Sequence, residues 1–155
     1  MTTPPILLHL PDPEATDRIA RHLAPRLRAG DVLLLSGPVG AAKTHFARAL
    51  IRARLGRDED VPSPTFTLVQ TYDAGDLEIW HADLYRLSDP AEIEELGLTE
   101  AFDTAICLVE WPDRLSDLRP ADALDLAFAH AETGRDVTLS WSSGDWSTRL
   151  SDLAA

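Results

Sequence analysis

Lys43 is the only lysine among the 14 lysine and arginine residues of the chain. It stands in the segment Gly37-Pro38-Val39-Gly40-Ala41-Ala42-Lys43-Thr44. A lysine ammonium is a compact point charge that reaches the β and γ phosphates of a nucleotide, where the planar guanidinium of arginine is bulkier. The two glycines free the backbone to wrap the phosphates, and the positive end of a following helix attracts them. The segment predicts a phosphate-binding P-loop, with an ordinary strand-to-helix turn as the alternative.

A bound triphosphate also needs Mg²⁺, and the sequence offers oxygen ligands for it. The Thr44 hydroxyl follows the lysine directly. Glu110 ends the apolar run 106–109, and residues at the carboxyl ends of parallel strands face the ligand crevice. We therefore expect Thr44 and Glu110 to hold the ion or its water shell, with Glu110 orienting the attacking water. Asp83 ends another apolar run and is a second catalytic candidate, although hairpin ends also favour aspartate. For Glu110, the structural alternative is an ion pair with a nearby arginine such as Arg114.

Ala42 departs from the P-loop pattern, which has glycine immediately before the lysine. A methyl group there crowds the phosphate or forces a backbone angle that glycine tolerates better, at a cost of about 1–3 kcal/mol. That cost corresponds to a roughly ten- to hundred-fold loss of affinity. The sequence therefore predicts a weakened nucleotide site.

The composition narrows the choice of ligand and partner. Guanine-specific P-loop proteins usually carry an Asn-Lys-x-Asp segment, and the chain has no second lysine to build one, so ATP is favoured over GTP. Aspartate and glutamate outnumber lysine and arginine by 26 to 14, and the net charge of -12 repels nucleic acid. Direct, high-affinity binding of DNA or RNA is therefore not expected.

Cysteine usage and the first residues indicate the compartment. Cys107 is the only cysteine, and its apolar neighbours indicate a buried thiol in a reducing environment. The N-terminal segment lacks a basic region, and its apolar run is too short for a signal core or a membrane span. We expect a cytoplasmic protein without a membrane segment. The histidines have no metal-ligand spacing and are interpreted as structural or surface residues: His9, His22, His45, His81 and His130.

Strands and helices must position these residues, and the hydrophobic pattern predicts both. Asp12 is a good helix N-cap because Pro13 follows it, and Gly30 is expected to end that helix after Leu27. The apolar run 31–36 has no polar alternation, which is typical of a central strand covered on both faces. The other predicted strands are 6–10, 65–72, 77–83, 105–109, 123–131 and 136–142, and the other predicted helices are 44–55, short pieces from Asp89 and Thr99, and 145–153.

The order of these elements predicts the fold class. At 155 residues the chain fits one domain, and we predict a single P-loop ATPase domain over residues 1–155. Its class is α/β, with a mostly parallel central sheet, helices on both faces and antiparallel hairpin additions.

Five segments occur together in an order that one family shares. They are Pro11-Asp12, the loop 37–44, Ser63-Pro64-Thr65-Phe66-Thr67-Leu68-Val69, His81-Ala82-Asp83-Leu84-Tyr85-Arg86-Leu87 and Glu110-Trp111-Pro112. The last three are similar to the patterns S-P-T-[YF]-T-L-V, H-x-D-L-Y-R-L and E-W-P. In these segments the chain resembles the bacterial TsaE (also called YjeE) P-loop ATPases of tRNA threonylcarbamoyladenosine biosynthesis, and the likeness spans most of its length.

The resemblance implies an ATPase of low activity alone that works with the TsaB and TsaD proteins, which modify adenosine 37 of tRNAs reading ANN codons. The tRNA would be contacted mainly through these partners, which agrees with the acidic surface. ATP or ADP would bind with Mg²⁺, with Thr44 and Glu110 holding the ion. The likeness implies nucleotide contacts from Asp12, Gly37, Val39, Gly40, Ala41, Ala42, Lys43, Thr44 and His45.

The resemblance also implies roles outside the loop. Ser63, Thr65 and Thr67 would belong to a switch-like loop that senses the γ phosphate. Asp83 and Trp111 match positions implicated in function.

Two other functions remain open from the sequence. Ala42 motivates a degenerate module that keeps the partner interface and has lost hydrolysis. A small P-loop kinase acting on a metabolite shares the strand-loop-helix arrangement, although no arginine-rich lid follows the loop. Arg86 and Arg114 are candidates for neutralising transition-state charge, with solvated surface arginines as the alternative.

Overall fold

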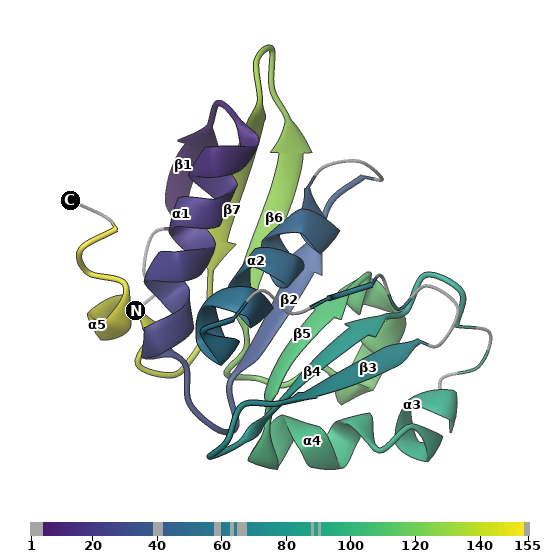
Figure 1. Cartoon of the computed structure of the whole chain (residues 1–155). Helices are drawn as coiled ribbons and strands as arrows, with labels where there is room; N and C mark the ends of the chain where they lie inside the picture. Colours follow the sequence, from purple (N-terminus) through teal and green to yellow (C-terminus); the bar gives the residue numbers. More distant parts are fainter. Residues whose placement is uncertain are drawn as a thin grey trace.

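The computed structural model of the chain describes residues 5–38, 42–57, 60–62, 64, 68–87, 89 and 91–153. These residues form a seven-stranded sheet with helices against both faces (Figure 1). The strands are β1 (Ile6–Leu10), β2 (Val32–Ser36), β3 (Val69–Asp73), β4 (Glu78–Asp83), β5 (Ile106–Glu110), β6 (Leu124–His130) and β7 (Arg135–Ser140). The helices are α1 (Pro13–Leu23), α2 (Lys43–Leu55), α3 (Ala91–Glu95), α4 (Leu98–Thr104) and α5 (Trp146–Arg149), with 3-10 segments η1 (Ala24–Arg26) and η2 (Pro112–Leu118).

The strands are ordered β1-β7-β6-β2-β5-β4-β3 across the sheet. The four strands β6, β2, β5 and β4 are parallel neighbours, and every other pairing is antiparallel. The α/β class and the antiparallel hairpins are therefore confirmed. The expectation of a mostly parallel sheet needs correction to a mixed sheet, because the hairpins β3–β4 and β6–β7 extend it on both sides and β1 adds an outer strand.

Strand β2 shows why the core has two layers. Its side chains alternate, so that Leu33 and Leu35 pack in the cluster with Phe46 of α2, while Val32 and Leu34 pack in the cluster with Phe102 of α4. All four β2 leucine and valine side chains are buried. The run without polar alternation is thus a strand covered on both faces, as predicted. Helices α1 and α2 lie side by side on one face, and α4 lies on the other (Figure 1).

The first helix begins where predicted and ends earlier. The Asp12 carboxylate accepts a hydrogen bond of 2.9 Å from the Ala15 N–H, which satisfies a helix N-terminal donor. Helix α1 ends at Leu23 and passes into η1, because Pro25 has no N–H and restricts the residue before it. The prediction of a helix through Leu27 closed by Gly30 is therefore wrong.

The hairpins carry their own turn chemistry. In the β3–β4 turn the Ala74 N–H donates to the Leu77 carbonyl at 2.9 Å. In the β6–β7 turn Gly134 has φ 72°, and a Cβ there would lie 2.1 Å from the Leu10 carbonyl oxygen. Only glycine fits at position 134, because the Leu10 carbonyl lies so close to its backbone. The predicted strand start at 65–67 lies outside the described residues, and within them β3 begins at Val69.

Helix length and hydropathy decide whether a helix can cross a membrane. Within the described residues, no helix is both long enough and apolar enough to span a bilayer.

Candidate functional site

The predicted phosphate loop connects the carboxyl end of β2 to the first residue of α2. Two carboxylates stand at the neighbouring strand ends, because Asp83 of β4 is in register with Glu110 of β5, and Glu110 with Leu35 of β2. Side chains two residues apart on a strand share a face. Glu110 therefore lies on the same face as Leu108, which packs with Phe46 of α2. The start of α2 and the two acidic strand ends thus meet at one edge of the sheet.

Lys43 is buried although it carries a charge, with 5% of its surface exposed. Its Nζ donates to the Gly37 carbonyl and, at 3.3 Å, to the Pro38 carbonyl. It also lies 4.0 Å from the centroid of the Trp111 ring, within the range of a cation–π contact. Burial lowers the pKa of Lys43, and the nearby carboxylates of Glu110, Asp83 and Asp113 oppose that shift. The loop carbonyls, the ring and the carboxylates together hold a compact cation at this edge.

Thr44 and Glu110 are in direct contact. The Thr44 hydroxyl donates to Glu110 Oε1 at 2.8 Å. The other carboxylate oxygen, Oε2, lies 2.7 Å from Nε2 of His81. Glu110 and His81 are 2% and 0% exposed, so these two side chains are shielded from bulk water, whereas Thr44 is half-buried. Each oxygen of the Glu110 carboxylate therefore has a hydrogen-bonding neighbour, Thr44 on one and His81 on the other.

Asp83 and Trp111 border the same site. Asp83 is buried, and its Oδ1 accepts from the Tyr85 N–H at 3.0 Å. The Tyr85 ring packs against the Trp111 ring with centroids 4.9 Å apart. Trp111 itself has φ 59°, in the left-handed region, and its N–H donates to the Leu35 carbonyl at 3.3 Å. The chain thus bends sharply after Glu110 and places the indole ring over Lys43.

Two backbone angles shape the loop ends. Gly37 has φ 132°, and a Cβ there would lie 2.3 Å from the Phe128 carbonyl oxygen, so this position excludes other residues. Ala42 precedes α2 with φ 84° and ψ 13°, in the left-handed region that favours glycine. The residue that departs from the P-loop pattern therefore has the angle that makes glycine preferable there. Its carbonyl accepts the first α2 hydrogen bond, from the Phe46 N–H at 2.9 Å.

Comparison with known proteins assigns the chain to a family. The family model described as Threonylcarbamoyl adenosine biosynthesis protein TsaE matches residues 10–137, more than half of the chain. The chain belongs to the TsaE family. A tRNA threonylcarbamoyladenosine biosynthesis protein TsaE from Rickettsia felis is 42% identical over 112 residues, covering 72% of this chain and 66% of that protein. Its Bacillus subtilis counterpart is 39% identical over 129 residues, covering 82% of this chain and 80% of that protein.

A solved structure agrees with this assignment to the TsaE family. The crystal structure of Bacillus subtilis YdiB matches with a TM-score of 0.82 at 29% identity, covering 99% of this chain and 95% of that one. The matches span 66% and 60% of the TsaE proteins of Rickettsia felis and Rickettsia conorii, slightly less than two thirds of those proteins. The structural match therefore extends over nearly the whole chain, whereas these two sequence matches cover 72% and 68% of it.

The structure brings several of the predicted site residues of this TsaE-family protein together, while others lie apart. Lys43, Thr44, Asp83, Glu110 and Trp111 meet at the end of β2, β4 and β5 through the contacts described above. Other residues expected to contact nucleotide have partners in α1 or lie outside the described residues. Asp12 caps α1, His45 pairs with Asp17 of α1 at 2.8 Å, and Val39, Gly40, Ala41, Ser63, Thr65 and Thr67 lie outside the described residues.

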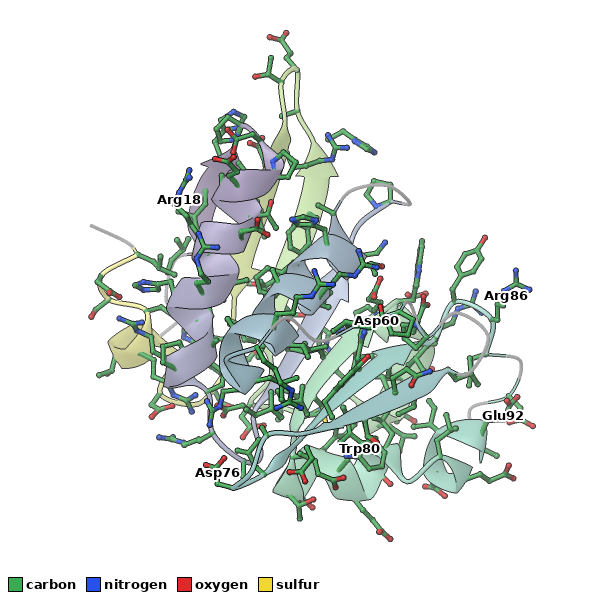
Figure 2. All side chains as sticks on the ribbon, in the orientation of Figure 1. Arg18, Asp60, Asp76, Trp80, Arg86 and Glu92 are labelled. Carbon is green, nitrogen blue, oxygen red and sulfur yellow. The ribbon has the colours of Figure 1, made fainter. Side chains whose placement is uncertain are left out.

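His81 is the member of this site that sequence reasoning did not single out. Its separation from Asp83 by two residues on one strand places both on the same face, and that spacing was the available signal. The alternative partner considered for Glu110 was Arg114, whereas the Glu110 carboxylate contacts Thr44 and His81. Arg114 is exposed on η2, and Arg86 points outward from the loop after β4 (Figure 2).

The donor set at this edge fits Mg²⁺. In the described residues, no three His, Cys, Asp or Glu side chains gather to form an all-protein metal cage. Mg²⁺ usually keeps several waters and takes one or two protein oxygens together with phosphate oxygens. The Thr44 hydroxyl and the Glu110 carboxylate would supply those protein oxygens.

Proposed function

We propose that this chain is an ATP-binding, weakly ATP-hydrolysing accessory factor of tRNA threonylcarbamoyladenosine biosynthesis that acts with TsaB and TsaD. The observation that carries the proposal is the Thr44–Glu110 hydrogen bond of 2.8 Å beside the buried cation of Lys43. A threonine at the start of α2 that pairs with a glutamate at the end of β5, with a lysine one position before the threonine, supplies the parts that a nucleoside triphosphate with Mg²⁺ requires. The names of the relatives support the pathway.

Each residue has a role that its surroundings permit. Lys43 binds phosphate oxygens, since its ammonium has three donors and lies among groups that tolerate a cation. Thr44 and Glu110 hold Mg²⁺, which when bound neutralises charge that develops on the phosphates. Glu110 also accepts a hydrogen bond from the attacking water and orients that water for in-line attack. Asp83 adds negative charge near Lys43 and fixes the start of the Tyr85 loop.

The low activity expected of the isolated chain follows from the arginine positions. Phosphoryl transfer is accelerated strongly when an arginine stabilises the transition-state charge. Arg86 and Arg114 are both exposed side chains, and Arg86 points outward from the loop after β4 (Figure 2). We therefore assign the missing stabilisation to the partner proteins. The net charge of -12 also leaves tRNA contact to those partners.

Hydrolysis in the presence of TsaB and TsaD tests the proposal. With ATP and Mg²⁺, the unmodified chain should turn over, and Lys43→Ala or Glu110→Gln should reduce turnover by about 100-fold or more, as removal of other charge-stabilising groups does. Glu94→Gln is the matched control, because Glu94 is an exposed carboxylate on α3. Turnover that survives both site substitutions would refute the assigned chemistry.

The Ala42 methyl group, at a position where the P-loop pattern has glycine, favours one second candidate, a module that binds its partners and does not hydrolyse ATP. Calorimetric titration of the unmodified chain with ATP and with ADP separates the two functions. Micromolar binding of ATP supports the ATPase. Absence of nucleotide binding, together with retained binding to the partner proteins, supports the non-hydrolysing module.

A further inference from the structure

The His81 imidazole is placed rigidly beside Glu110. Its strand, β4, lies between β3 and β5, with His81 in register with Gln70 on one side and Leu108 on the other. The ring is fully buried, and the close packing around it restricts changes of rotamer. Its Nε2 lies 2.7 Å from Glu110 Oε2, a distance typical of a hydrogen bond to a carboxylate.

We propose that His81 is a positioning residue that fixes the Glu110 carboxylate for Thr44 and Mg²⁺. This inference rests on the proposed ATPase function and extends it to a residue that the nucleotide need not touch. Glu110 has two oxygens, and each must be oriented if one is to bind Thr44 at 2.8 Å. A hydrogen bond from His81 to the other oxygen sets the rotation of the whole carboxylate.

The second ring nitrogen identifies which form of the ring makes this contact. His81 Nδ1 is buried and has no hydrogen-bond partner among the described residues. A buried N–H without an acceptor costs more than a bare nitrogen lone pair, because the donor loses its water without replacement. The geometry therefore favours a hydrogen on Nε2, which donates to Glu110.

An imidazole donor suits a carboxylate that must also attract a cation. An arginine at this place would orient Glu110 and at the same time cancel its charge. The imidazole orients the carboxylate through one hydrogen bond and brings no guanidinium into the site. Loss of such an outer hydrogen-bond partner typically weakens metal affinity by about 10- to 100-fold.

Two substitutions separate positioning from packing. His81→Leu fills the space without a donor, whereas His81→Gln retains an N–H group that reaches a similar position. We would measure Mn²⁺ binding by electron paramagnetic resonance in the presence of ADP, and turnover with TsaB, TsaD and Mg²⁺. His81→Leu should bind Mn²⁺ about 10- to 100-fold more weakly than the unmodified chain. His81→Gln should recover most of that loss, and turnover at limiting Mg²⁺ should follow the same order.

Ile79→Ala is the matched control for lost stability. Ile79 is fully buried on β4, two residues before His81 on the same face, and it lies outside the site. This variant should unfold more easily and still bind Mn²⁺ as the unmodified chain does. If His81→Leu keeps the unmodified Mn²⁺ affinity, or if Ile79→Ala loses as much affinity as His81→Leu, the positioning role is overturned.

Nitrogen NMR of the imidazole tests the contact without nucleotide or metal. The expected spectrum shows a hydrogen on Nε2, and a hydrogen on Nδ1 alone would overturn the inference. Failure of the unmodified chain to bind nucleotide would instead refute the proposed function. The NMR result would then still decide whether His81 donates to Glu110, so the two failures are distinguishable.

Discussion

At the scale of single residues, Ala42 links sequence, backbone strain and ligand binding. The folded chain itself adopts φ 84° at this position. The strain of the left-handed angle therefore lowers the free energy of unfolding. Only contact of the methyl group with phosphate would reduce affinity. From the sequence alone, the whole energetic cost of the alanine was expected to reduce nucleotide affinity. In the structure, the backbone strain reduces stability, and only the methyl contact would reduce affinity.

Ala42→Gly should therefore stabilise the fold by about 1 kcal/mol, since glycine adopts a positive φ without a Cβ clash. Urea unfolding of the two proteins measures this difference. The affinity for ADP should change by less than about threefold, which is below 1 kcal/mol. A gain of tenfold or more in a calorimetric titration would show that the methyl group crowds the phosphates.

Gly56 offers the matched control at the other end of α2. It caps this helix with φ 72°, and a Cβ there would meet nothing within 4 Å. Gly56→Ala introduces the same backbone strain without a packing clash, so it should destabilise the fold by about 1 kcal/mol and leave ADP binding unchanged. The two substitutions thus exchange alanine and glycine at two left-handed positions of one helix.

At the scale of elements, β5 carries both a buried thiol and the site carboxylate. Cys107 is fully buried in the middle of this strand. Burial raises the pKa of the Cys107 thiol from its ordinary value of 9.0 to about 12. Because the folded pKa lies above the unfolded one, the unfolded chain loses this proton first. Stability is intact below pH 9 and declines as the pH rises toward 12.

This linkage predicts a pH-dependent difference between the unmodified chain and Cys107→Ala. Between pH 8 and pH 10 the thiol should cost the unmodified chain about 1.4 kcal/mol of unfolding free energy. Cys107→Ala lacks the thiol and should not show this part of the decline. Urea unfolding at both pH values gives the comparison, and an equal decline in the two proteins would contradict the assigned burial effect.

How far the sequence predicts the elements depends on whether their signals are local. The start of α1 follows from Asp12 and Pro13, and its end was missed because Pro25 outweighed the helical spacing of Leu27. The pairing of β1 with β7 joins residues such as Ile6 and Leu139, and no local pattern specifies that register. The strand-end carboxylates were predictable because parallel strands end at one edge. The His81 contact was not, since it depends on the register of β4 against β5.

At the scale of the whole molecule, one end of the sheet carries the candidate site and the opposite end carries a cluster of ion pairs. The carboxyl ends of β2, β4 and β5 gather the residues of the candidate site. At the amino end of β2, Asp31 accepts hydrogen bonds from Arg149, one of them 3.0 Å long, and from the Arg28 N–H at 2.7 Å. Arg149 also pairs with Asp145 and lies over the Trp146 ring, 4.2 Å from its centroid. This cluster ties α5 to the start of the central strand.

The ion pair of Asp31 with Arg149 should therefore support stability without affecting nucleotide binding. Its side chains are 9% and 12% exposed, so Arg149→Ala leaves a largely buried carboxylate without its main cation. We expect a loss of about 2–4 kcal/mol in unfolding free energy, between the values for surface and fully buried ion pairs. Arg21→Ala, at an exposed position of α1, should change stability by less than about 0.5 kcal/mol. At a temperature where both variants remain folded, calorimetry should give unchanged ADP affinity. A large loss of affinity in Arg149→Ala would mean that the two ends of the sheet are coupled, because the substitution touches no residue of the candidate site.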